Sequence, residues 1–309
     1  MSVSIVMRSK DSDWVIAQAL GSLYSQTFRD FDLVVVDSGS TDRTLEIVRR
    51  YPCRLVQIPA ADYVPGAVLN RAIALCRGDL LVFQNSDAVP LSPHTLARLL
   101  AAFDDPGVDA AFGRQIPRPE ARGWVRRDLA ESFPEIGPAP AWMPYALPFA
   151  AMRRAAWERH AFHAEAWGSE DTEWGVWARR HGREIRYVAD AIVMHSHNYT
   201  LKELYGRRFI EGEADAFIQG DRDSVPRLAR RVLGSALRDL VSHVNDARDA
   251  RHRDLAGLCA APVRRAVSHY GYFKGHRHGE ARLSSGGGDA GRSRRVLERY
   301  GGTAAREAR

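Results

Sequence analysis

The sequence predicts an α/β protein whose core is a doubly wound, mainly parallel sheet. Short apolar runs recur along the chain, and each is long enough for one buried strand. Apolar residues recur at helical spacing in the segments between the runs, and the connections are short, as in right-handed βαβ units. The runs lie at residues 3–7, 31–36, 54–58 and 80–83.

Helices are expected between these strands, at residues 12–25, 41–51 and 64–76. Thr41 is the expected N-cap of the second helix, because its hydroxyl can accept from a backbone N–H of the first turn. No Gly-x-Gly-x-x-Gly sequence follows the first strand. This argues against a dinucleotide-binding oxidoreductase.

The rest of the chain predicts a change from sheet to helices. An irregular, proline-rich loop at residues 134–148 is either an acceptor wall or a structural strap. Beyond Thr200 the pattern is helical throughout. We therefore expect a sheet domain over residues 1–199 and a helical extension over 200–309, with a flexible tail from about residue 284, where Gly and Ser dominate.

Composition is that of a soluble globular protein, and the expected location is the cytoplasm. Of 309 residues, 45% are hydrophobic, and the N-terminus has no secretory signal. The sequence contains no apolar run of the ~20 residues that a membrane-spanning helix needs. The three cysteines are widely spaced and predict neither a disulfide framework nor a zinc site.

The net charge of +6 comes from the last third of the chain, where 22 Lys and Arg face 14 Asp and Glu. Such an excess can attract an anionic membrane surface, so a peripheral contact near the inner face of the membrane is one expectation. Nucleic acid is not an expected partner, because no basic motif interleaved with aromatic residues accompanies the charge. An apolar stripe from Val225 to Val244 has to dock on the core, on a second copy in a homodimer, or on a membrane.

Polar side chains follow two of the predicted strands. Asp37 ends the second strand and Gly39 lies in the turn after it, an edge that suits a nucleoside; the alternative is a helix N-terminus with a capping acid. Asn85, Ser86 and Asp87 follow the fourth strand, and the alternative there is an Asx-type turn. Both segments are expected at the ligand-binding edge of the sheet.

Four segments carry a resemblance to a known family: VSIVMRSKD, VVVDSGSTD, PGAVLNRAIALCRGDLLVFQNSDAVP and WGSEDTEWGVWARRHG. In this order they resemble the motifs of family 2 glycosyltransferases, which have the GT-A fold. HSHNYTLKELYGRRFIEGEA further resembles bacterial rhamnosyltransferase-like members. The resemblance implies inverting transfer of a sugar from a nucleoside diphosphate donor, such as dTDP-rhamnose or a UDP-sugar. The implied acceptor is a hydroxyl of a glycan or lipid-linked glycan, and the implied cofactor is Mn²⁺ or Mg²⁺.

Residue roles at the donor follow from the matched motifs. Asp37 matches the Asp that contacts the nucleobase, and Asp87 matches the metal ligand of the family's DXD segment. Asn85 stands where that segment often has its first acid, which lowers the charge of the site by one. The remaining residues expected near the nucleotide sugar are Arg8, Ser9, Gly39, Asn70, Ser86, Arg207 and Arg208. Leu69 replaces the family's Arg, so a phosphate contact has to come from elsewhere.

Glu170 and Asp171 form the second chemical centre. Resemblance assigns Asp171 as the general base that takes the acceptor's proton, and Glu170 as an orienting or acceptor-binding residue. The alternative is that both acids complement the dipole of a helix that begins near Thr172. Trp167 is expected to stack on the acceptor sugar.

His195 is expected to be a second metal ligand, because some related enzymes have a metal-binding His shortly after the helix that carries the base. The alternative is a hydrogen-bonded strand residue, and His197 is a weaker candidate for the same role. Arg207 and Arg208 suit phosphate through bidentate hydrogen bonds, or belong to a solvated helix face. Taken together, the residues predict a metal-dependent glycosyltransferase; the alternative is a protein that binds nucleotide sugar without turnover.

Overall fold

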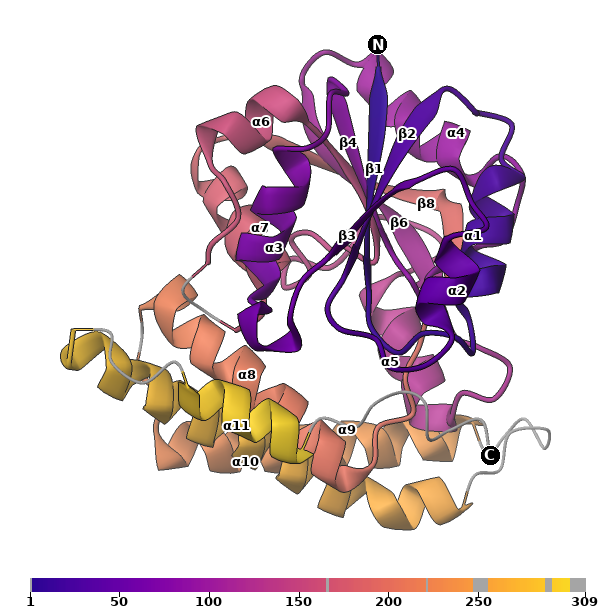
Figure 1. Cartoon of the computed structure of the whole chain (residues 1–309). Coiled ribbons are helices and arrows are strands. Elements are labelled where there is room, and N and C mark those ends of the chain that lie inside the picture. The colour runs from indigo at the N-terminus through magenta and orange to yellow at the C-terminus, as the bar shows by residue number, and fades with distance from the viewer. Residues whose placement is uncertain (1, 165–166, 221, 247–254, 287–290, 301–309) are drawn as a thin grey trace.

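The computed structural model describes residues 2–164, 167–220, 222–246, 255–286 and 291–300. One eight-stranded sheet is covered by helices on both faces, and the C-terminal helices form a layer below it (Figure 1). The strands are β1 (Val3–Ser9), β2 (Phe31–Asp37), β3 (Arg54–Gln57), β4 (Leu80–Asn85), β5 (Val89–Pro90), β6 (Val108–Ile116), β7 (Phe149–Arg153) and β8 (Glu184–Met194). The helices are α1 (Ile16–Tyr24), α2 (Thr44–Val48), α3 (Pro65–Ile73), α4 (Thr95–Ala101), α5 (Gly123–Ser132), α6 (Arg154–Arg159), α7 (Glu170–Arg180), α8 (Leu201–Gln219), α9 (Val225–Asp246), α10 (Leu255–Ser284) and α11 (Gly291–Tyr300).

The strand order is β3-β2-β1-β4-β7-β6-β8-β5. The first four strands are parallel, β7 runs antiparallel to both β4 and β6, and β8 is parallel to β6. The mainly parallel, doubly wound sheet predicted from the sequence is therefore confirmed. Since β1, β2 and β4 run in the same direction, the residues that follow them meet at one edge of the sheet.

Two apolar layers hold the helices to the sheet. Alternate residues of the buried strands point to opposite faces, so Ile5 and Met7 join one layer while Val6 joins the other. Helices α1, α2 and α4 pack on the first face, and α3, α6 and α7 pack on the second. Trp174 of α7 is fully buried in the second layer.

The second predicted helix differs from the structure. It was expected over residues 41–51 with Thr41 as its N-cap, but α2 spans only Thr44–Val48. The backbone N–H of Thr41 instead donates to the Asp11 carboxylate at 2.8 Å, and Asp42 accepts from the backbone N–H of Thr44 at 2.9 Å. Arg43 is the N-cap of α2, and Asp42, one residue before it, accepts from the first N–H of the helix.

Helices α8 and α10 run side by side in the same direction with their backbones in contact. Gly271, Gly275 and Gly279 of α10 face successive turns of α8. A Cβ at Gly275 would lie 1.8 Å from the carbonyl oxygen of Phe209, and one at Gly279 would lie 2.7 Å from that of Glu213. We call this contact the glycine seam; the spacing of four residues places these three glycines on one face of α10.

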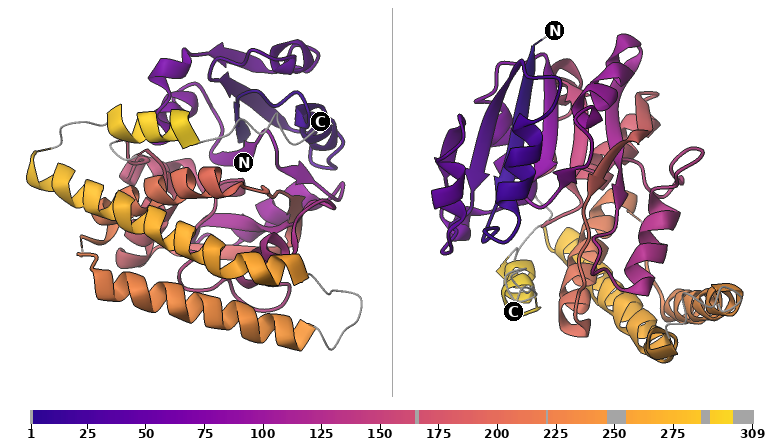
Figure 2. Two further views of the ribbon diagram at one scale, coloured as in Figure 1. Left: turned by 90° about the horizontal axis from the view of Figure 1, so that it is seen from below. Right: turned by 90° about the vertical axis from the view of Figure 1, so that its right-hand side faces the viewer.

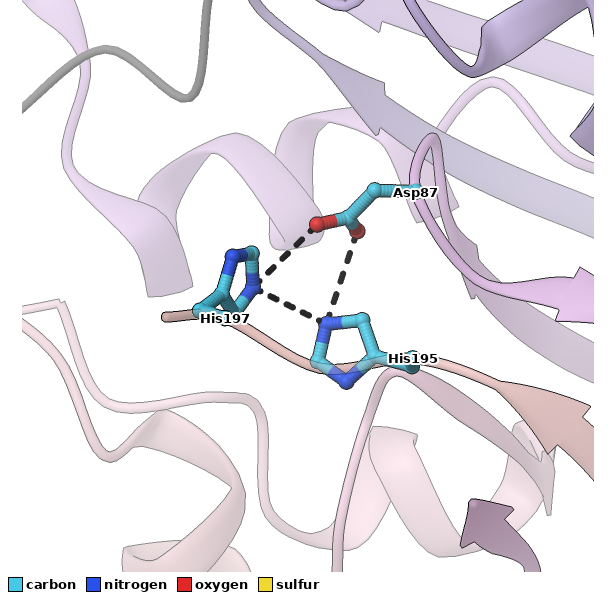
Figure 3. A group of neighbouring side chains, drawn as sticks. All are labelled: Asp87, His195 and His197. Atoms are coloured by element: carbon cyan, nitrogen blue, oxygen red, sulfur yellow. Dashed lines mark hydrogen bonds and ion pairs between the residues drawn. The ribbon is translucent and has the colours of Figure 1, made fainter. Parts of the chain in front are cut away.

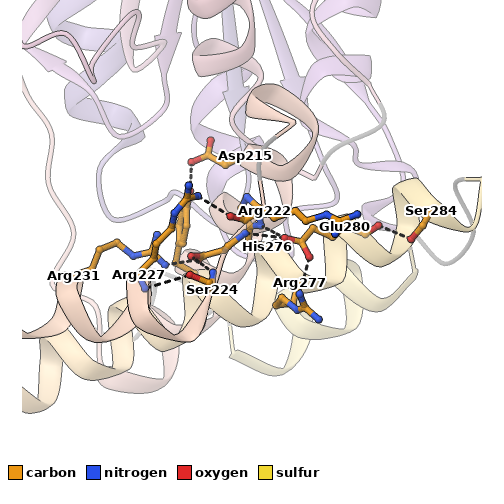
Figure 4. Close-up of polar contacts among 11 residues, drawn as sticks. Asp215, Arg222, Ser224, Arg227, Arg231, His276, Arg277, Glu280 and Ser284 are labelled. Carbon is orange, nitrogen blue, oxygen red and sulfur yellow. Dashed lines mark hydrogen bonds and ion pairs between the residues drawn. The ribbon is translucent and has the colours of Figure 1, made fainter.

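Helix α9 lies outside α10, as two further views show (Figure 2). Glu280 of α10 accepts from the backbone N–H of Asp223 at 2.9 Å and lies 3.2 Å from His276, so the start of α9 is tied to α10 (Figure 4). Of the stripe predicted to dock, Val232 and Ala236 are half-buried, whereas Leu240 is exposed. The side chain of Val244 lies outside the described residues. Among those described, no helix has the length and hydropathy for crossing a membrane.

The tail also differs from the prediction. The sequence predicted a flexible segment from about residue 284, but residues 291–300 form α11, which packs on α8. Ser293 of α11 is fully buried and donates from its hydroxyl to Glu213 of α8, whose carboxylate also accepts from Arg282 of α10 at 2.5 Å. A buried carboxylate shared by three helices gives this part of the tail a defined place. The predicted flexibility of residues 301–309 lies outside the described residues.

Candidate active site

The carboxyl edge of β1, β2 and β4 faces the layer of C-terminal helices (Figure 1). Arg8 and Ser9 end β1, Asp37 ends β2, and Asn85 ends β4. The hydroxyl of Ser86 lies 2.9 Å from that of Ser12, and its backbone N–H donates to the Arg8 carbonyl at 3.2 Å. The segments after β1 and β4 are therefore joined, as a ligand site at this edge requires.

Asp37 is fully buried and accepts hydrogen bonds only from its own neighbourhood among the contacts that the structure describes. Its donors are the hydroxyls of Ser9 and Ser40, at 2.8 and 2.5 Å, and the backbone N–H groups of Gly39 and Ser40, at 3.1 and 2.9 Å. Gly39 has a φ of +83°, in the left-handed region that glycine adopts without strain. Asp37 thus shapes the loop after β2, and its contact with a nucleobase stays a prediction.

Asp87, His195 and His197 form one cluster beyond β4 and β8 (Figure 3). The Nε2 atom of His195 lies 3.5 Å from one oxygen of Asp87, and that of His197 lies 3.2 Å from the other. The two Nε2 atoms are 3.3 Å apart. The structure thus brings together the two predicted metal ligands and the histidine that was the weaker candidate.

Gln115 at the end of β6 orients the cluster. Its side-chain oxygen lies 2.7 Å from Nδ1 of His195, which places the ring proton on Nδ1 and the lone pair of Nε2 toward Asp87. Burial, together with neighbouring positive charge, lowers the pKa of His195 to about 4 and also lowers the pKa of His197. Near neutral pH, therefore, two neutral imidazoles and one carboxylate present acceptor atoms to the same small space. Such a donor set fits a divalent cation.

Arg118 supports the cluster from the loop after β6. Its guanidinium donates to the backbone carbonyl of Asp87 at 2.5 Å and stacks over the ring of Trp14 at 4.7 Å. Neither Arg118 nor Gln115 was predicted from the sequence. The available signal was a strand that ends in polar residues, but nothing in the chain order indicates that β6 lies beside β8.

Glu170 begins α7 and forms an ion pair with Arg8 across the edge of the sheet. The Nη1 and Oε1 atoms are 2.5 Å apart, and the side chains are 16% and 8% exposed. This pair joins the donor side of the site to the predicted base. Trp167 is 7% exposed and packs on Tyr63 with ring centroids 6.0 Å apart, so it is a packing residue of this loop in the structure rather than an open stacking platform.

Asp171 follows Glu170 and accepts from the backbone N–H groups of Leu147 at 3.3 Å and of Thr172 at 2.8 Å. Burial raises its pKa, and the negative charge of Glu170 raises it further, to about 6. Ser169, just before the helix, has a φ of +58°, so the backbone is strained where the two acids begin. A carboxylate with a pKa near the working pH is suited to general base catalysis.

The two predicted arginines of α8 share one acid. Glu211 lies 3.1 Å from Nε of Arg207 and also pairs with Arg208, which stacks over Tyr272 of α10 at 5.1 Å. Arg207 is 59% exposed, and its positive charge contributes to the lowered pKa of His195 and His197 and partly offsets the raised pKa of Asp171. Of the two arginines, Arg207 is therefore the candidate for binding a phosphate at the cluster.

Asn70 of α3 lies apart from the cluster and holds the loop that leads to α7. Its side-chain oxygen accepts from Trp157 at 2.9 Å and from the backbone N–H of Phe162 at 3.0 Å, and its amide donates to the Phe162 carbonyl at 2.8 Å. The predicted contact of Asn70 with the nucleotide sugar stays a prediction.

The comparison with protein families decides what kind of site this is. Residues 4–168, more than half of the chain, match the model of glycosyl transferase family 2. The chain belongs to this family. It is an enzyme family, and the resemblance first noted from the sequence motifs is confirmed.

Two relatives of this family 2 glycosyltransferase are O-antigen chain rhamnosyltransferases. WbaN of Salmonella anatum is 30% identical over 201 residues, which cover 60% of this chain and 63% of WbaN, so the match spans less than two thirds of that protein. RfbN of Salmonella typhimurium is 26% identical over 227 residues, covering 69% of this chain and 72% of RfbN. The relationship is modest in identity and extends past the family motifs into the C-terminal part.

A solved structure shows the same fold. The mannosyltransferase PcManGT from Pyrobaculum calidifontis, in complex with GDP-Man and Mn²⁺, superposes with a TM-score of 0.56 at 18% identity, covering 96% of this chain and 78% of that one. The GT-A fold expected from the sequence is therefore confirmed.

Proposed function

We propose that this family 2 glycosyltransferase is an inverting, divalent-metal-dependent enzyme of polysaccharide synthesis. The observation that carries the proposal is the cluster of Asp87, His195 and His197 at the carboxyl edge of the sheet. The donor is a nucleoside diphosphate sugar, and dTDP-rhamnose is the first choice because two relatives are named rhamnosyltransferases. The acceptor is a hydroxyl of a glycan or lipid-linked glycan.

Asp87, His195 and His197 would hold the cation, with Gln115 and Arg118 keeping the cluster in place. A divalent cation there offsets the charge on the departing diphosphate. Arg207 supplies a second positive charge, and its planar guanidinium can bind two phosphate oxygens. Leu69 stands where the family motif has an Arg, and Arg207 of α8 would supply the phosphate contact in place of that Arg. Ser9, Gly39, Asn85 and Ser86 line the edge on which the nucleoside lies.

Asp171 takes the proton of the acceptor hydroxyl as that oxygen attacks the anomeric carbon. The bond from this carbon to the diphosphate breaks on the opposite face, so one displacement inverts the configuration. Glu170 and Arg8, as an ion pair, orient the loop and limit the repulsion between the two adjacent carboxylates. This mechanism requires one general base close to the acceptor hydroxyl.

Calorimetric titration with dTDP and UDP, with and without Mn²⁺, tests the assignment of the cluster. Asp87→Ala is expected to remove the gain in nucleotide affinity that Mn²⁺ gives the wild-type protein. Asp190→Ala is the matched control, because Asp190 is an exposed acid at the far side of β8. An unchanged Mn²⁺ effect in Asp87→Ala would refute the assignment.

A turnover assay then separates an enzyme from a protein that only binds nucleotide sugar. Wild-type protein, Mn²⁺ and dTDP-rhamnose or a UDP-sugar are incubated with and without a glycan acceptor, and released nucleotide is measured. Release that depends on the acceptor supports transfer. Tight binding with no release from any donor favours the alternative.

A further inference from the structure

The exposed face of α9 is apolar. Leu233 and Leu237 are 70% and 62% exposed, and Leu240 and Val241 are 48% and 52% exposed. Spacings of four and three residues place these side chains on one side of the helix, and we call them the α9 stripe. Of the twelve large hydrophobic side chains that the structure shows as exposed, five lie on α9. The concentration on one helix distinguishes this face from scattered surface leucines.

The opposite face of α9 already has its partner. Ser235 is buried with its hydroxyl 3.0 Å from Nε2 of His269, and Asp239 is buried and accepts from Arg265 at 2.8 Å. Both partners belong to α10, and α9 is the outer helix of this layer (Figure 2). The α9 stripe therefore faces away from the rest of the described chain and covers no part of its core.

Positive charge accompanies the stripe. Arg227, Arg230 and Arg238 are exposed on α9. Asp239 is the one acid among the side chains that the structure describes on this helix, residues 225–241, and it is turned inward toward Arg265. The exposed surface of this segment thus combines leucines with arginines and shows no carboxylate.

We propose that α9 lies in the surface of an anionic lipid bilayer, with the stripe among the acyl chains and the arginines at the phosphate groups. Helical spacing places Arg230 among the stripe leucines and Arg227 and Arg238 at their flank, so the exposed face offers both the apolar and the cationic groups that an interfacial helix needs. Each arginine gains from the negative surface potential of such a membrane. A second copy fits less well, because two such faces would bring arginine against arginine with no exposed acid between them. No described helix could cross the membrane, so α9 would be a surface contact.

Binding of the full chain to vesicles tests this proposal independently of any transferase activity. Sedimentation is compared for vesicles of phosphatidylcholine alone and mixed with phosphatidylglycerol, at low and high salt. The wild-type protein is expected to bind the anionic vesicles and to lose affinity as salt screens the charges. Arg230→Gln with Arg238→Gln should weaken binding about 30-fold, taking about fivefold for each charge.

The apolar contribution is tested by Leu233→Gln with Leu237→Gln, which should weaken binding about tenfold or more. Two double variants serve as matched controls. Leu91→Gln with Leu283→Gln removes two exposed leucines elsewhere, and Arg43→Gln with Arg50→Gln removes two exposed arginines of the sheet domain. Both should bind as the wild type does.

Absence of binding to anionic vesicles overturns the proposal, and so does unchanged binding by Leu233→Gln with Leu237→Gln. Sedimentation velocity adds a further arm. The wild-type protein could instead form a dimer that Leu233→Gln with Leu237→Gln dissociates, and fail to bind vesicles. That result would assign the stripe to a second copy and would also overturn the membrane contact.

Discussion

Replacing Asp171 by Asn separates chemistry from binding. The amide is nearly isosteric with the carboxylate but accepts no proton at neutral pH, so transfer should fall by the factor typical of a general base, roughly 10²–10⁴. Affinity for donor and Mn²⁺ should stay near wild type, because Asp171 is not part of the metal cluster. Single-turnover transfer at saturating donor measures the first quantity, and calorimetry measures the second.

The pH profile gives this prediction its magnitude. With a pKa of about 6, Asp171 is ionised to about one tenth at pH 5 and about nine tenths at pH 7, so the wild-type rate should rise about tenfold over this range. The Asn variant should lose this acidic limb. Transfer at the wild-type rate, or a variant that keeps the limb, would show that the base lies elsewhere.

Variants of the Arg8–Glu170 pair should shift the acidic limb of the pH profile in opposite directions. Glu170→Gln removes the negative charge beside Asp171, so the acidic limb should move to lower pH. Arg8→Gln leaves Glu170 unpaired, so the limb should move to higher pH. Shifts in the same direction for both variants would contradict the assignment of the limb to Asp171.

The free energy of unfolding should also depend on the ionisation of Asp171. Since folding raises the pKa of Asp171 from 3.8 to about 6, the folded state binds its proton more tightly than the unfolded state does. Stability therefore falls as pH rises from about 4 to 6 and stays lower above that range. The Asn variant does not titrate, so its melting temperature should exceed that of the wild type increasingly through this range and by a constant margin above it.

Three further predictions concern the support of the site and the C-terminal layer. Gln115→Leu removes the acceptor that orients His195, so Mn²⁺ affinity by calorimetry should fall about 10- to 100-fold while metal-free nucleotide binding stays unchanged. Ser293→Ala takes one donor from buried Glu213, and urea unfolding should show a loss of about 1.5–3 kcal/mol; no loss would mean that α11 is not seated as described. Gly275→Ala should destabilise by about 3 kcal/mol or more, because its Cβ would overlap an α8 carbonyl, whereas alanine at Gly234, with open space around it, should stabilise by about 0.5–1 kcal/mol.

Local patterns predicted the first half of the fold well, because each strand and helix there is defined by its own apolar spacing. They also located Asp87, Glu170 and Asp171 at element ends. The roles of Gln115 and Arg118 were not predicted because they depend on β6 lying next to β8. These two segments are about 80 residues apart in the sequence.

The C-terminal layer was harder to predict for a different reason. Its apolar residues are few, and α8, α10 and α11 are joined by glycine contacts and by buried charge around Glu213. The spacing of hydrophobic residues predicts neither the glycine contacts nor the buried charge. The four-residue repeat of Gly271, Gly275 and Gly279 was visible in the sequence and is the signal that could have located the α8–α10 contact.

The glycine seam also has a mechanical consequence. Backbones in direct contact leave no layer of side chains that could shear, so α8 moves only if α10 moves with it. Arg207 belongs to α8, and residues 195–200, which include both histidines, separate this helix from β8. Any closure of Arg207 onto a bound diphosphate therefore requires α8 and α10 to move together relative to the six-residue segment after β8, rather than the movement of a loop alone.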